Sequence, residues 1–240
     1  KYYLSIDNKV VNREDINTNE IPIADDLDFA GWDIIKAVRL LATGNATIYE
    51  WINSPIIYRA DETFMNFIKD VANLAYNPYK LFKHYYSLAS DNLYGKFNSP
   101  DNSLKKTMYV IRSTLCALYI YNNEFDVDKS FIISGKYHTN KFTMPDVDMM
   151  NLYIKTIEVD NDFGKAILKL YSEKISSQED KLIKTNSPEF QCIYLNVCNY
   201  LDTFKKYLND TAAEKFRQDN FELIDSKLYE LLQHYINIEY

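Results

Sequence analysis

The chain has few cysteines, few histidines and no long hydrophobic run, and each shortage excludes a class of protein. Its three cysteines are an odd number set in apolar helical patterns, so we expect reduced core thiols rather than disulfides or metal ligands. Its three histidines are scattered and form no zinc signature. No stretch approaches the roughly 18 apolar residues of a membrane span. We therefore expect a cytoplasmic protein, in a host cytoplasm if its source is viral, with no membrane partner.

Positive charge is also in short supply. There are 27 basic and 34 acidic residues, which gives a formal net charge of −7. A protein that coats duplex nucleic acid is usually basic, so any nucleic-acid contact here should be local, at a small basic patch beside an acidic metal site. The chain has 21 tyrosines, and lysine far outnumbers arginine. This bias is typical of AT-rich coding genomes, such as those of many phages.

Helix signals fill most of the chain. Helical spacing from residue 34 should end at Gly44, because glycine readily takes the left-handed C-cap conformation. Asp61 is placed to cap a later helix, Asn102 or Ser103 to open another, and Pro78 suits the first turn of a third. Further helices are expected near 146–158 and 161–176. Extended segments are expected near residues 2–6 and 20–29.

The segment from Asp25 to Lys36 is the strongest functional signal. It sets acidic residues at the end of an extended stretch, before a Gly-Trp turn and an amphipathic helix. Asp26 and Asp28 lie two residues apart, so on one strand face they could bind a single metal ion unaided. The alternative is structural: Asp28 would cap a helix that starts near Ala30.

The residues after this acidic pair have two interpretations each. Lys36 could meet a phosphate, or it could form a surface ion pair with Asp33. Trp32 and Trp51 are interpreted as core packing that orients the loop, with base stacking as the alternative.

A candidate basic stripe lies further along the chain. Lys105, Tyr109 and Arg112 fall at i, i+4 and i+7, on one helical face, where they could bind a triphosphate or an RNA backbone. The alternative is an ordinary solvated face. His84, close to two lysines, forms a weaker cluster and is equally readable as a structural histidine.

Several strings in this order resemble a known family. They are Asp-Leu-Asp-Phe-Ala-Gly-Trp-Asp-Ile-Ile-Lys-Ala at 26–37, Glu-Trp-Ile-Asn-Ser-Pro-Ile at 50–56, His-Tyr at 84–85 and the segment 104–112. Together they are similar to the predicted nucleotidyltransferases of the DNA polymerase beta superfamily, in the branch named for an RNA-repair pathway. The resemblance covers roughly residues 1–175.

The resemblance implies a metal-dependent enzyme. Such enzymes transfer an NMP from an NTP to a hydroxyl with Mg²⁺ or Mn²⁺, and RNA with tRNA-like ends is the favoured acceptor. Asp28 would be the third family carboxylate, a catalytic metal ligand, with Asp26 beside it; Lys36, Lys105, Tyr109, Arg112 and His84 would bind substrate. The Gly-Ser turn and Asp-x-Asp pair of the family are not found ahead of Asp28. The opening Tyr2-Tyr3-Leu4-Ser5 looks like the segment after that pair, so we expect either that the N-terminal motif precedes residue 1 in a longer protein or that this protein has lost it. Residues 1–240 alone would not complete a two-metal site.

The predicted fold is therefore α+β and mostly α. Residues 1–60 would be part of a polymerase-beta-type nucleotidyltransferase sheet, 61–180 a helical region packed on it, and 187–240 a C-terminal helical hairpin. Two functions of other classes stay open. One is a noncatalytic nucleotide- or RNA-binding module, for example a phage-encoded regulator, and the other is a scaffold that oligomerises through the C-terminal helices.

Overall fold

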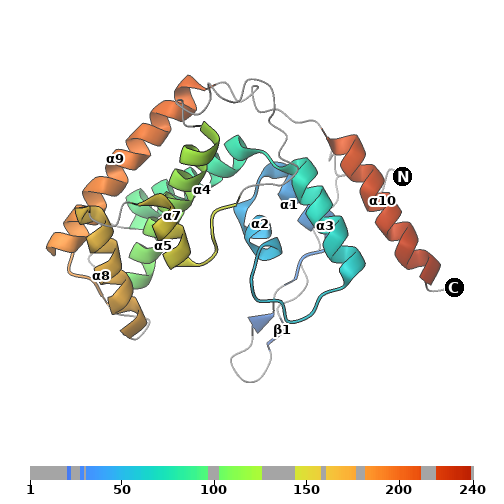
Figure 1. Cartoon of the computed structure of the whole chain (residues 1–240), viewed down its shortest axis with the longest axis horizontal. Coiled ribbons are helices and arrows are strands. Elements are labelled where there is room, and N and C mark those ends of the chain that lie inside the picture. Colours follow the sequence, from blue (N-terminus) through green and yellow to red (C-terminus); the bar gives the residue numbers. More distant parts are fainter. Residues whose placement is uncertain are drawn as a thin grey trace. The chain divides into compact units, whose positions relative to one another are not determined.

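The computed structural model of the chain describes residues 21–22, 28–29, 31–96, 103–125, 144–157, 161–176, 182–211 and 220–238. These residues are mostly helical and divide into two compact units (Figure 1). The first unit contains β1 (Ile21–Pro22), β2 (Asp28–Phe29), α1 (Ile34–Thr43), α2 (Ala46–Ile52), α3 (Glu62–Ala75) and α10 (Phe221–Ile238). The second contains α4 (Pro78–Lys96), α5 (Leu104–Ile120), the π-helical turn η2 (Tyr121–Phe125), α7 (Met149–Thr156), α8 (Asp162–Ser176) and α9 (Pro188–Asp210).

The predicted nucleotidyltransferase sheet is wrong for the part of the chain that the structure describes. Within that part, the strands are β1 and β2, a two-residue antiparallel pair in which Ile21 faces Phe29 and Pro22 faces Asp28. The segment 20–29 is thus not one continuous strand. Pro22 has no N–H to donate to a ladder, which limits how far such pairing extends. The expected strand at 2–6 lies outside the described residues, and the predicted three-domain division stays a prediction.

Helix α1 begins and ends where side-chain chemistry requires. The Asp33 carboxylate accepts hydrogen bonds from the N–H groups of Ile35 (3.0 Å) and Lys36 (3.2 Å), two donors that the helix itself leaves unsatisfied. Gly44, at φ 76°, ends the helix as predicted, because its left-handed conformation disfavours a side chain. The chain then turns directly into α2.

Tyr49 of α2 links α1 and α3 through hydrogen bonds of its hydroxyl group. Its side chain is fully buried, and its hydroxyl donates to the carbonyl oxygens of Leu41 in α1 (3.3 Å) and Ala72 in α3 (3.4 Å). Burial raises the pKa of the Tyr49 phenol above its ordinary value. The phenol therefore stays protonated and continues to donate at any physiological pH.

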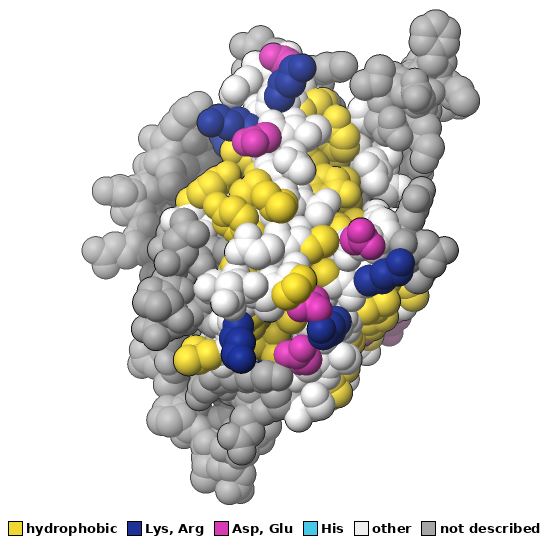
Figure 2. All heavy atoms as spheres, turned by 90° about the vertical axis from the view of Figure 1, so that its left-hand side faces the viewer, with side chains coloured by type: hydrophobic (Ala, Val, Ile, Leu, Met, Phe, Trp, Pro, Cys, Tyr) yellow, Lys and Arg dark blue, Asp and Glu magenta, His cyan; other side chains and the backbone are white. Residues whose placement is uncertain are grey.

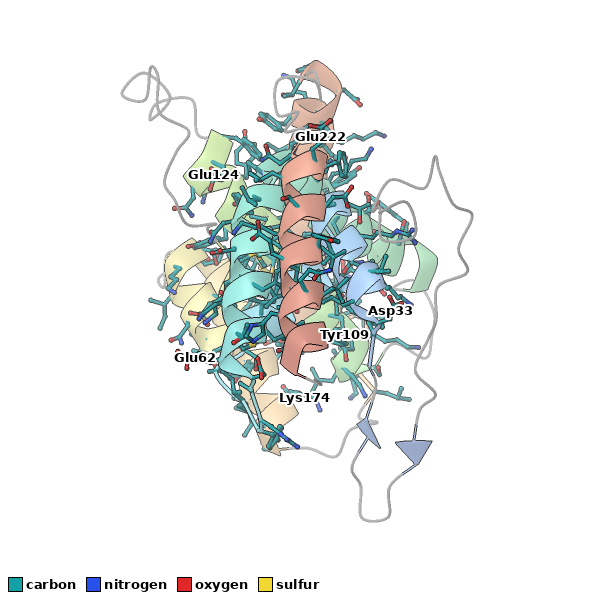
Figure 3. The ribbon with its side chains drawn as sticks, turned by 90° about the vertical axis from the view of Figure 1, so that its right-hand side faces the viewer. Asp33, Glu62, Tyr109, Glu124, Lys174 and Glu222 are labelled. Carbon is teal, nitrogen blue, oxygen red and sulfur yellow. The ribbon has the colours of Figure 1, made fainter. Side chains whose placement is uncertain are left out.

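Helix α10 packs along α3, and the N-termini of the two helices lie at opposite ends, as the positions of Glu62 and Glu222 in Figure 3 show. Ile224, Leu228 and Leu231 form its buried face. Three polar contacts accompany this face: Asn220 Nδ2 to the Leu74 carbonyl (2.8 Å), Lys227 Nζ to Asp70 Oδ2 (2.9 Å) and the Tyr235 hydroxyl to Asp61 Oδ1 (2.7 Å).

The predicted C-terminal hairpin is corrected by this packing. Both helices form, but α9 packs on α8, α4 and α5 in the second unit, whereas α10 packs on α3 in the first. Amphipathic spacing specifies which face of a helix is buried and says nothing of its partner.

The second unit is built around α4 and α5, which pack against each other. Helix α5, capped by Ser103 as predicted, buries side chains on most of its circumference. Where α5 passes into η2, a cluster of rings closes the unit: Phe82, Tyr121, Phe125, Phe204 and Tyr207. Figure 2 shows one face of the molecule, on which apolar side chains lie between charged ones.

No helix in the described part of the chain is both long enough and apolar enough to cross a membrane.

Candidate functional site

Asp28 opens strand β2, three residues before the Gly-Trp turn begins at Gly31. Its backbone pairs with Pro22 of β1. The position of its side chain is not among those that the structure describes, and Asp26 lies outside the described residues altogether. The structure therefore places the backbone of the principal candidate at a strand end, and its role as a metal ligand stays a prediction.

The structural alternative for Asp28 does not hold. That alternative required Asp28 to cap a helix starting near Ala30, but α1 starts at Ile34 and Asp33 is its N-cap. The same geometry explains Asp33 without any catalytic role, because its carboxylate satisfies two backbone N–H groups of the first turn. Capping of α1 thus accounts for Asp33 and not for Asp28.

The two tryptophans lie against each other, which the sequence did not predict. The rings of Trp32, just before α1, and Trp51, in α2, are stacked with their centroids 4.2 Å apart and an interplanar angle of 20°. Trp51 is 47% exposed, so the prediction of core packing is wrong for this residue. The Lys36 ammonium lies 5.8 Å from the centroid of the Trp32 ring, within the range of a cation–π interaction. The Gly44 turn between α1 and α2 brings the rings together, and no local spacing rule links positions this far apart.

The candidate basic stripe on α5 is only partly open to solvent. Lys105 and Tyr109 are exposed, with Tyr109 at 56%. Arg112 is half-buried, and its Nη1 donates to the carbonyl oxygen of Asp146 (3.4 Å) and lies 3.5 Å from the Cys116 Sγ. Lys105 and Tyr109 can therefore meet a ligand from solvent, whereas Arg112 helps to hold the segment before α7.

Asp146 also forms an ion pair with Lys155 through its side chain. Lys155 Nζ lies 2.8 Å from Asp146 Oδ2, and this hydrogen bond holds the pKa of Asp146 below its ordinary value while it raises the pKa of Lys155. The Asp146 backbone faces Arg112 and its side chain faces Lys155. This arrangement anchors α7 near α5.

His84 lies on α4, half-buried, with its ring edge-on to Tyr85 at a centroid distance of 6.0 Å. It belongs to the second unit together with Lys105, Tyr109 and Arg112, whereas Asp28 and Lys36 belong to the first. Among the residues that the structure describes, no group of three or more His, Cys, Asp or Glu side chains is arranged to hold a metal ion. The substrate-binding and metal assignments therefore remain predictions.

Comparison with known proteins gives one family and one curated relative. Residues 1–126, more than half of the chain, match the RNA repair pathway DNA polymerase beta family (RlaP). The match confirms the resemblance drawn from the motifs, and it includes β2 and all of α1–α5. Over 101 residues the chain is 31% identical to the uncharacterized protein YcgL of Bacillus subtilis (strain 168); the aligned part is 42% of this chain and 39% of that protein. No solved structure matches the chain.

Proposed function

Because the chain belongs to the RNA repair pathway DNA polymerase beta family, we propose that it is a nucleotidyltransferase that moves an NMP from an NTP to a hydroxyl acceptor, with RNA as the acceptor. Family membership by itself indicates a polymerase-beta-like nucleotidyltransferase, and the acceptor is our extension from the family's link to RNA repair. The observation that carries the proposal is the match across residues 1–126, which includes the strand-end Asp28 and the helix that follows it.

Asp28 is the proposed catalytic carboxylate, with Asp26 as its neighbour. Carboxylate oxygens are the ligands that Mg²⁺ prefers, so this donor pair suits Mg²⁺, or Mn²⁺ in its place. The bound ion would neutralise phosphate charge during in-line transfer. Helix capping by Asp33 supports the assignment, because it leaves the first turn of α1 satisfied without Asp28.

Lys105 and Tyr109 are the proposed contacts to the acceptor. Both are exposed on α5, where an ammonium group and a phenol ring can meet a phosphate and a base. Replacing both by alanine should weaken RNA binding and reduce its salt dependence. If the RNA affinity of this double variant is unaltered, Lys105 and Tyr109 do not contact the acceptor.

The test is incorporation of labelled NMP by the intact protein, with Mg²⁺, each of the four NTPs and total RNA. Asp28→Asn should abolish incorporation without lowering the thermal stability of the fold. Asp33→Asn is the matched control: it makes the same acid-to-amide change nearby, and asparagine caps helices about as well as aspartate, so this variant should stay active. Full incorporation by Asp28→Asn would remove Asp28 from the site.

A noncatalytic nucleotide- or RNA-binding module is the second candidate. It is favoured by the exposed Lys105 and Tyr109 of α5, which can contact a nucleotide or RNA without taking part in any reaction. Such a module would bind NTP or RNA with no incorporation under any of the conditions above. Binding that persists in Asp28→Asn, together with absent turnover in the unaltered protein, would identify it.

A further inference from the structure

The stacked tryptophans of the first unit form a rigid aromatic surface. The interplanar angle of 20° and the centroid distance of 4.2 Å mean that one face of the Trp51 indole is covered by Trp32. With 47% of Trp51 still exposed, much of its remaining surface is in contact with water. A large aromatic side chain gains most from burial, so an exposed one held in a fixed stack is well suited to receive another flat ring.

The surroundings of the stack favour a ligand that carries phosphate. Lys36 places its ammonium over the Trp32 ring, 5.8 Å from its centroid, so a positive charge lies on the Trp32 side of the stack. A nucleotide combines the two groups that this pair would meet, a flat base and an anionic phosphate. A purely apolar partner would gain nothing from the ammonium.

The stack is also close to the proposed catalytic carboxylate along the chain. Asp28 and Trp32 are four positions apart, a stretch of chain that spans at most about 14 Å when fully extended. An extended nucleoside triphosphate can bridge that distance between its base and its terminal phosphate. The backbone of Asp28 and the Trp32 side of the stack therefore lie within the length of one nucleotide.

We propose that the Trp32–Trp51 stack is a binding platform for a nucleobase, which stacks on the exposed indole of Trp51 with its phosphate near Lys36. The base belongs either to the NTP or to a single-stranded RNA end, and both present the same flat ring. This inference deepens the proposed function and rests on it for the choice of a nucleotide.

The chain supplies its own reporter, because these are its only two tryptophans. Indole emission, excited at the red edge of its absorption and corrected for nucleotide absorbance, should fall as each NTP or a short single-stranded RNA is added. The titrations contain a chelator, so that no turnover takes place. Inorganic tripolyphosphate has the charge of an NTP without the base and should leave the emission unchanged. Whichever of NTP and RNA binds more tightly identifies the source of the base.

Two substitutions separate stacking from simple hydrophobic contact. Trp51→Phe keeps an aromatic face, whereas Trp51→Leu keeps apolar bulk without one. Affinity measured by filter binding or calorimetry should be nearly retained in Trp51→Phe and should fall by about 5- to 150-fold in Trp51→Leu, the usual range for losing one base–aromatic stack. Tyr58→Ala, at a side chain of the same unit that is 96% exposed, is the control and should bind as the unaltered protein does.

Equal nucleotide affinity in Trp51→Leu and Trp51→Phe would contradict the proposed binding platform. Quenching of indole emission by tripolyphosphate as strong as that by NTP would also contradict it. The proposed reaction fails separately: absent incorporation with binding that still depends on the Trp51 ring would leave the platform standing. Conversely, if the protein incorporates NMP and Trp51→Leu binds nucleotide as the unaltered protein does, the proposed reaction is supported and the binding platform is contradicted.

Discussion

The core of the second unit contains a cluster of aromatic rings, whereas the first unit is completed by α10, a helix from a distant part of the chain. In the second unit, the Phe82 ring lies 5.2–6.0 Å from the centroids of four others, contributed by η2 and α9. In the first unit, α10 contributes a narrow apolar face and three polar contacts to α3. The candidate catalytic and stacking residues belong to the first unit.

This difference suggests how stability and chemistry are distributed. A dense aromatic cluster resists local opening, whereas a helix held partly by solvent-exposed polar contacts opens at lower cost. The two units can be followed separately, because Trp32 and Trp51 both lie in the first. Indole emission therefore reports on the first unit, and far-ultraviolet circular dichroism reports on the helices of both.

The largest effect is expected in the ring cluster. Phe82→Ala removes a fully buried ring and should lower the free energy of unfolding of the second unit by about 3–5 kcal/mol. Circular dichroism during urea unfolding should show an earlier transition, while indole emission should change at the original midpoint. Movement of both midpoints together would break the comparison, since the units would then unfold as one.

Leu228→Ala makes the corresponding change in α10. Leu228 is fully buried, so the cavity should cost the first unit about 2–5 kcal/mol, and the indole midpoint should fall. Leu223→Ala, at an exposed position of the same helix, should change stability by about 0.5 kcal/mol or less. Equal losses in the two variants would mean that this packing face of α10 is wrongly assigned.

The ion pair between α3 and α10 should matter less. Lys227→Met removes the charge and keeps much of the stem, and because Asp70 is well exposed the pair should contribute about 1 kcal/mol or less. A double-mutant cycle with Asp70→Asn, followed by indole emission at low and high salt, measures the coupling. A coupling that is large and insensitive to salt would contradict a solvent-screened pair.

The smallest effect concerns acid. The Tyr235 hydroxyl donates to Asp61, and this hydrogen bond holds the pKa of Asp61 below its ordinary value. A carboxyl group with a lowered pKa in the folded state stabilises that state above its unfolded pKa, and this contribution is lost as pH falls through the folded pKa. Tyr235→Phe should therefore raise the pKa of Asp61 in carboxyl NMR titrations and weaken the acid dependence of the indole midpoint. An unchanged Asp61 titration would show that the Phe64 N–H bond suffices.

Helix boundaries followed from the sequence because their causes are local. Asp61, Ser103 and Gly44 perform the capping roles that their chemistry predicts. The helices predicted near 146–158 and 161–176 also form, as α7 and α8.

Partners could not be predicted in the same way. Spacing placed Lys105, Tyr109 and Arg112 on one face, but the Arg112 guanidinium meets a carbonyl 34 positions away in the sequence. Likewise, the sequence predicted two C-terminal helices without revealing that α9 packs on α8 and α10 on α3. The Trp32–Trp51 stack depends on the turn at Gly44, which brings two separate segments together. Long-range contacts of this kind depend on the whole fold rather than on local pattern.

The contact between Asn220 and the Leu74 carbonyl, 146 positions apart, has a consequence for synthesis on the ribosome. Helix α3 is synthesised before the second unit, whereas α10, on which it packs, is synthesised after it. The α3–α10 contact therefore forms only once α10 has been translated. During that interval the second unit can fold, while the apolar flank of α3 is available to chaperones or to neighbouring chains. A fragment that stops at residue 216 keeps the second unit and lacks α10, so it should aggregate where the longer chain does not.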